Sequence, residues 1–115
     1  AAYGAFCRFT DSDNYYDFSI ESDGYYRLGK VVAGTWETLI DWTATTAINT
    51  GAGETNRIRV VCSGSTLELY ANGQLVATTQ DTSLIGGGFA LLARRFAEDD
   101  VAVSVAFDNV EVKYP

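Results

Sequence analysis

The segment LELYANGQLVA alternates apolar and polar positions on both sides of one Asn-Gly pair. Such alternation places successive side chains on opposite faces of a β-strand. Asn72 and Gly73 tolerate the two positive φ angles of a type I′ turn, so residues 67–77 are predicted to form a tight hairpin. On its first strand Leu67 and Leu69 are expected to face a core, and the polar residues between them to face away.

The same period of two recurs along most of the chain. Residues 3–32 are predicted to form a three-stranded meander, because the turn formers DSDN and SDG separate three alternating runs. In the second run Tyr16, Phe18 and Ile20 share a face that we assign to the core. A short strand is expected at 35–42. The small and polar residues that follow, 43–56, predict a long loop with an extended piece at 47–49.

Further strands are expected at 57–63 and, after a triple glycine, at 89–96, with one long or kinked strand over 101–114. Residues 89–100 could also hold a short helix, although they lack an N-cap. Eight to ten strands with frequent turns predict an all-β fold. We expect one antiparallel β-sandwich or jelly roll that spans residues 1–115.

Composition narrows the classes of function. The net charge of −7, from 15 acidic and 8 basic residues, would repel a phosphate backbone, so nucleic-acid binding is disfavoured. The longest apolar runs are too short to cross a bilayer, which argues against membrane insertion. The chain has no histidine, and therefore neither a Ser-His-Asp nor a Cys-His nucleophile system can be built from it.

The two cysteines predict an oxidising environment. In the strand assignment Cys7 shares a face with Phe9, and Cys62 shares one with Ile58 and Val60, so both thiols point toward the core. One disulfide between them would fit a secreted or cell-surface protein. Two separate buried thiols are the alternative.

The order of several motifs resembles the concanavalin A-like lectin/glucanase superfamily. Within it the chain is most similar to the laminin-G-like and keto-disaccharide-hydrolase-like domains of exported bacterial proteins. The motifs are a Tyr-rich hairpin, N-x-I-x-V at 56–60, L-x-L-Y-x-N-G at 67–73, the segment GGGFALLARR and F-D-N-V-x-V at 107–112. The resemblance implies a concanavalin A-like sandwich, a fold that hosts lectins, glycosidases and structural modules.

Domains of this type usually carry further strands before the Tyr-rich hairpin. The resemblance therefore implies that the chain is a C-terminal fragment of a longer domain, or a sandwich that another chain completes. Open strand edges would favour self-association or pairing with that chain.

Aromatic residues on one face of the meander suggest a glycan as the ligand. The predicted platform consists of Tyr15, Asp17, Tyr25, Arg27 and Trp42, because aromatic rings stack on the apolar C–H faces of sugars. The alternative is that tyrosine simply suits a half-exposed strand.

A structural calcium ion is a second expectation, and no other cofactor is expected. The resemblance implies calcium near Asp108 of the closing strand, with Asp81 as a second ligand. Both residues could instead belong to turns and edges. The acidic turn DSDN does not match an EF-hand, because tyrosines occupy the next ligand positions.

Catalysis is disfavoured because the E-x-D-x-x-E-like run of the superfamily's glucanases is absent. The acidic cluster at 98–100 is assigned to a turn, and Glu68 and Glu111 each stand alone. We therefore expect a non-catalytic carbohydrate-binding or adhesion module of an exported bacterial protein. The alternatives are a structural or assembly module and, third, a glycoside hydrolase.

Overall fold

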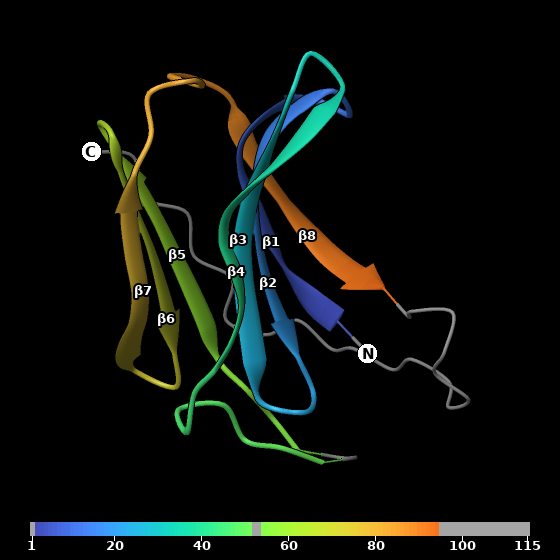
Figure 1. Cartoon of the computed structure of the whole chain (residues 1–115), viewed down its shortest axis with the longest axis vertical. Coiled ribbons are helices and arrows are strands. Elements are labelled where there is room, and N and C mark those ends of the chain that lie inside the picture. The colour runs from blue at the N-terminus through green and yellow to red at the C-terminus, as the bar shows by residue number, and fades with distance from the viewer. Residues whose placement is uncertain (1, 52–53, 95–115) are drawn as a thin grey trace.

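Two antiparallel sheets form the protein, and each is one layer of a sandwich (Figure 1). This computed structural model describes residues 2–51 and 54–94. The larger sheet has the strand order β4-β3-β2-β1-β8, and the smaller has the order β5-β6-β7. The strands are β1 (Ala2–Asp11), β2 (Asn14–Glu21), β3 (Tyr25–Val32), β4 (Thr35–Ala44), β5 (Ile58–Ser63), β6 (Thr66–Ala71), β7 (Gln74–Gln80) and β8 (Gly88–Arg94).

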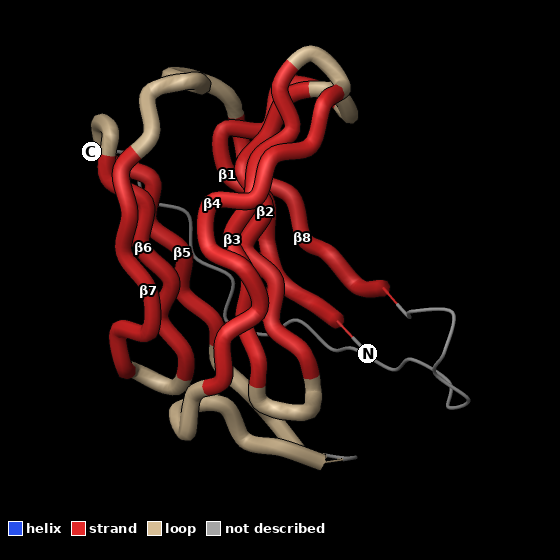
Figure 2. The backbone as a smooth tube through the Cα atoms, in the orientation of Figure 1, coloured by secondary structure: helices blue, strands red, loops and turns tan. Residues whose placement is uncertain are grey.

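The predicted all-β sandwich is confirmed, and the described residues contain no helix (Figure 2). The meander expected at 3–32 is present as β1–β3, and β4 extends it to Ala44. Residues 88–94 form a strand, so the helical alternative is wrong for that segment. No helix in the described part could cross a membrane. The strand expected over 101–114 and the acidic cluster at 98–100 lie outside the described residues.

The core lies between the sheets and follows the predicted alternation. Tyr16, Phe18 and Ile20 of β2 are almost fully buried, as are Leu67 and Leu69 of β6. Among the residues whose burial is described, the buried apolar cluster consists of Cys7, Tyr16, Phe18, Ile20, Tyr26, Leu28, Ala47, Ile48, Leu67, Leu69, Ala71 and Ala77. Burial of this apolar surface is the main favourable contribution to folding.

The hairpin between β6 and β7 turns at Asn72 and Gly73, whose φ angles are 51° and 83° as a type I′ turn requires. Asn72 also anchors the long loop before β5. Its Nδ2 donates to the Ala47 carbonyl and to Asn56 Oδ1, both at 2.8 Å, and its Oδ1 accepts from the Arg57 N–H. The loop forms no strand at 47–49. Instead Ala47 and Ile48 enter the core.

A bulge in β1 places the side chain of Arg8 in contact with the smaller sheet. Arg8 has a φ of 51°, and the pairing of β1 with β8 shifts between Cys7 and Phe9. The Arg8 side chain donates to the carbonyls of Cys62 and Gly64, each at 3.2 Å. It therefore joins the larger sheet to the turn between β5 and β6.

Cys7 and Cys62 form the predicted disulfide. It links β1 of the larger sheet to β5 of the smaller one, with the two Cα atoms 6.6 Å apart and the two cysteines 55 positions apart in sequence. The bond therefore constrains the two layers covalently, next to the contact of Arg8.

Loss of this disulfide is expected to lower the free energy of unfolding by about 4 kcal/mol, because it closes a long loop in the unfolded chain. The measurement is urea denaturation of the oxidised protein, of the reduced protein and of the Cys7→Ser/Cys62→Ser double variant. Equal transition midpoints for all three would contradict a structural role for the bond.

Candidate functional site

β3 separates two kinds of side chain onto its two faces. Tyr26 and Leu28 point into the core, whereas Tyr25 and Arg27 point to the outer face of the larger sheet. Tyr25 is 40% exposed. These two residues of the predicted platform therefore lie on one face, opposite the core.

A guanidinium group between two indole rings organises this face. The Arg27 Cζ atom is 4.6 Å from the ring centroid of Trp36 and 4.7 Å from that of Trp42. Both tryptophans belong to β4, the neighbouring strand. Cation–π contacts at this distance favour a fixed arrangement of the two rings. We call Tyr25, Arg27, Trp36 and Trp42 the aromatic strip.

Gly29 makes room for Trp36. A Cβ atom at Gly29 would lie 2.2 Å from the nearest atom of the Trp36 ring, so only glycine lets the indole rest against β3 at this point. Trp36 nevertheless remains 39% exposed. The ring is thus supported on its inner side and accessible from outside.

Tyr15 belongs to a second aromatic cluster on the same face. Its ring centroid is 4.3 Å from that of Phe6 and 5.6 Å from that of Phe9. The bulge at Arg8 brings Phe9 beside Phe6, with the two rings 6.0 Å apart and nearly parallel. All three residues are half-buried. The structure therefore divides the predicted platform into two clusters.

Asp17 differs from the expectation. It was predicted to stand at the surface of the platform, but it is only 2% exposed. Its cross-strand neighbours are Phe6 on β1 and Gly29 on β3, where Trp36 rests, and the Ser19 hydroxyl donates to its carboxylate. Asp17 therefore lies beneath the aromatic layer as a buried and hydrogen-bonded group, where a sugar on the surface would not reach it.

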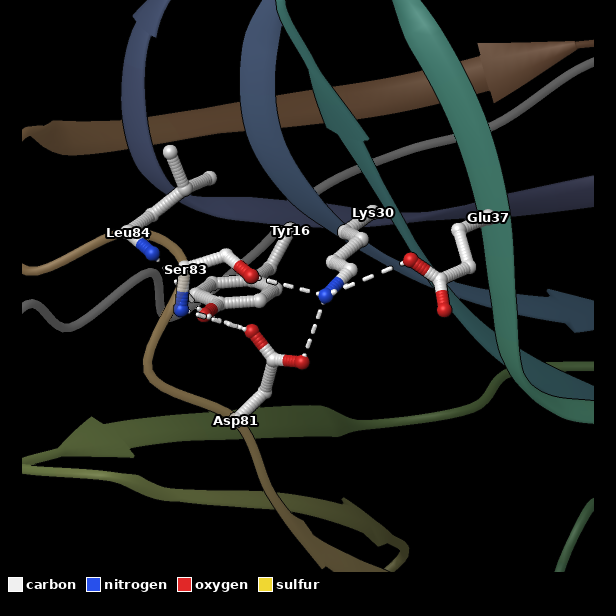
Figure 3. A network of polar contacts seen from close by, with 6 residues as sticks. All are labelled: Tyr16, Lys30, Glu37, Asp81, Ser83 and Leu84. Atoms are coloured by element: carbon white, nitrogen blue, oxygen red, sulfur yellow. Dashed lines mark hydrogen bonds and ion pairs between the residues drawn. The ribbon is translucent and has the colours of Figure 1, made fainter.

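Asp81, a predicted calcium ligand, binds a lysine instead (Figure 3). Lys30 Nζ lies 2.6 Å from Asp81 Oδ2 and donates to Ser83 Oγ at 2.7 Å. The Tyr16 hydroxyl donates to Asp81 Oδ1 at 2.7 Å and accepts from the Leu84 N–H. Because Tyr16 and Lys30 are on the larger sheet and Asp81 directly follows β7, the network joins the two layers.

Lys30 is thus the cationic partner of Asp81 within the described residues. Asp108 lies outside the described residues. Within the described ranges, no group of three or more His, Cys, Asp or Glu side chains could hold a metal ion. A structural calcium held by Asp108 and Asp81 stays a prediction.

Electrostatics in this network favour the ion pair. Burial alone would raise the pKa of the Asp81 carboxyl group, but hydrogen bonds from Lys30, Tyr16 and Ser83 outweigh it and hold the pKa well below its usual range. The hydrogen bond to Asp81 likewise raises the pKa of Lys30. Glu37, at 3.4 Å from Lys30 Nζ, is largely exposed and adds little.

Removing the Asp81 charge should destabilise the sandwich. Asp81→Asn removes the closer and more buried carboxylate partner of Lys30 and leaves only the exposed Glu37, and we expect a loss of about 3 kcal/mol at neutral pH. Because the folded pKa is depressed, this stabilisation is present above the unfolded pKa of about 3.9 and is lost as the pH falls further.

The measurement is urea unfolding of the wild type and Asp81→Asn between pH 7 and pH 2. The variant should lose less stability on acidification. Glu37→Gln serves as the control and should follow the wild type. An acid profile of Asp81→Asn that runs parallel to that of the wild type would contradict the role of the ion pair.

Sequence reasoning did not place Trp36 in the platform, nor did it find the support by Gly29. Trp36 and Trp42 are six residues apart, and alternation puts positions separated by an even number on the same face of a strand. The pattern that placed Trp42 in the platform could therefore have placed Trp36 there as well. The close approach of an indole to Gly29 depends on the register between β3 and β4, which the sequence pattern does not specify.

Comparisons with known proteins support the fold. No protein-family model matches the chain, and no curated sequence is similar to it. Among solved structures, the carbohydrate-binding module CBM66 from Bacillus subtilis is similar, with a TM-score of 0.66 and 17% sequence identity. The match covers 78% of this chain and 55% of that module, so the chain spans about half of its length. At this identity the likeness shows a shared β-sandwich fold.

Proposed function

We propose that this chain is a non-catalytic carbohydrate-binding or adhesion module, and that the aromatic strip is its binding surface. The proposal depends chiefly on one observation. Trp36 and Tyr25 are both large aromatic residues with about two fifths of their surface exposed, and they share a sheet face opposite the core. Aromatic rings in this position can stack on the apolar faces of sugar rings.

Two further findings support this proposal. The chain shares its fold with a carbohydrate-binding module. The disulfide between Cys7 and Cys62 suits an oxidising compartment. It thereby supports the secreted or cell-surface location that we propose for this chain, as part of an exported bacterial protein. Membership of the concanavalin A-like superfamily belongs to the same proposal.

An assembly role is the second candidate. β4, ten residues long, is one of the two edge strands of the larger sheet in the described part of the chain. Edge strands offer unpaired backbone groups to another chain. Assembly predicts oligomers in solution and no preference for any glycan.

Glycan binding can be tested by affinity electrophoresis in gels that contain a panel of plant and bacterial polysaccharides. The protein should be retarded by at least one of them, and Trp36→Ala should weaken that binding about tenfold through loss of a stacking surface. No reducing sugar should be released during incubation.

Tyr70→Ala is the matched control. Tyr70 is a half-buried aromatic residue on the outer face of the smaller sheet, where Arg59 lies over its ring. This variant should bind like the wild type. Unretarded migration in every gel, or equal weakening by Trp36→Ala and Tyr70→Ala, would contradict the proposal.

A further inference from the structure

The two exposed rings of the aromatic strip lie near opposite ends of one strand pair. Tyr25 is at the start of β3 and pairs with Ala44 at the end of β4, whereas Trp36 pairs with Val31 near the other end. The Trp36 ring rests against Gly29, four residues beyond Tyr25 on β3. At about 3.3 Å per residue these positions are separated by roughly 13 Å. That separation exceeds the length of a single sugar ring.

From this spacing, and on the basis of the function proposed above, we infer that the strip binds an uncharged glycan chain lengthwise. Sugar rings would stack at Trp36 and at Tyr25, and the sugars between them would lie over Arg27 and Trp42. The strip follows the β3–β4 pair from Tyr25 to Trp36, so a glycan of several sugars can lie along it. The ligand is therefore a stretch of several sugars rather than a single sugar.

The charges of β1–β4 favour a neutral ligand. The basic residues of β1–β4 are Arg8, Arg27 and Lys30. Arg8 donates to backbone carbonyls, Arg27 lies between two indoles and Lys30 is paired with Asp81. Apart from the buried Asp17, the same four strands and their turns carry six carboxylates, namely Asp11, Asp13, Glu21, Asp23, Glu37 and Asp41. Such a surface repels a polyanion such as polygalacturonate.

Arg27 and Gly29 act in this arrangement as positioning residues. Arg27 lies between the two indoles, and Gly29 leaves the space that the Trp36 ring occupies. Rings held in place before binding lose less conformational freedom when a ligand arrives. Gly29→Ala would therefore displace Trp36 without changing the charge of the surface.

The experiment measures affinity against chain length. Cello-, xylo-, manno- and fructo-oligosaccharides, from monosaccharide to hexasaccharide, are titrated calorimetrically into the whole chain, in low and high salt. In the series that binds, affinity should rise at least about tenfold between monosaccharide and tetrasaccharide, since a second stacking contact is then made. The dissociation constant should not change with salt, because no ionic contact is involved.

Tyr25→Ala and Trp36→Ala should each abolish the rise with length, and Gly29→Ala should reproduce the effect of Trp36→Ala. Tyr70→Ala should keep the full rise. Near-ultraviolet circular dichroism of each variant reports whether the core is intact, so that unfolding is not mistaken for loss of a contact.

Two results would overturn this inference while the proposed function stands. One is a monosaccharide that binds as tightly as its tetrasaccharide. The other is binding to polygalacturonate that is tighter than binding to the neutral sugars and that is lost in high salt. If none of these oligosaccharides and none of the polysaccharides binds, the proposed function itself fails, and the inference fails with it.

Discussion

The register in which β3 pairs with β2 and β4 determines where every side chain of the candidate site lies. A shift by one residue would turn Tyr25 and Arg27 into the core and expose Leu28 and Lys30. Burial of Leu28 resists such a shift, and so does the ion pair of Lys30 with Asp81 on the opposite layer. The outer aromatic surface and the inner core are therefore two consequences of one pairing.

Interactions between the layers hold this arrangement at separate points. The disulfide and the Arg8 hydrogen bonds join β1 to β5 and to the turn that follows it. The network of Tyr16, Lys30 and Asp81 connects β2 and β3 to the segment after β7. Each interaction is specific in geometry and modest in net energy, whereas the apolar cluster between the sheets supplies the larger and less specific contribution.

Alternation along the chain was sufficient to predict the layers and their faces. It gave the hairpin at Asn72 and Gly73, the inward position of Tyr16 and the inward position of both cysteines. These features depend on local geometry, because a strand has two faces and a type I′ turn needs residues that tolerate positive φ. They could therefore be predicted from short stretches of sequence.

Features that depend on contacts across the sandwich could not be predicted in this way. Asp17 is buried, and its cross-strand neighbours are Phe6 and Gly29, where the Trp36 ring rests. Asp81 meets Lys30 across 51 residues of sequence. Nor does the pattern show that Arg8 adopts a positive φ, although this bulge brings Phe9 beside Phe6. In each case the partner is set by strand order and register rather than by neighbours in sequence.

The proposed function requires that a ligand contact the outer face of β3 and β4. Nuclear magnetic resonance can locate that contact directly. An oligosaccharide that the protein binds is titrated into ¹⁵N-labelled protein, and the backbone amide and indole N–H signals are followed. We predict shifts at the Trp36 and Trp42 indoles and at the amides around Tyr25, with β5–β7 unchanged. Shifts confined to β5–β7 or to the segment around Ser83 would contradict it.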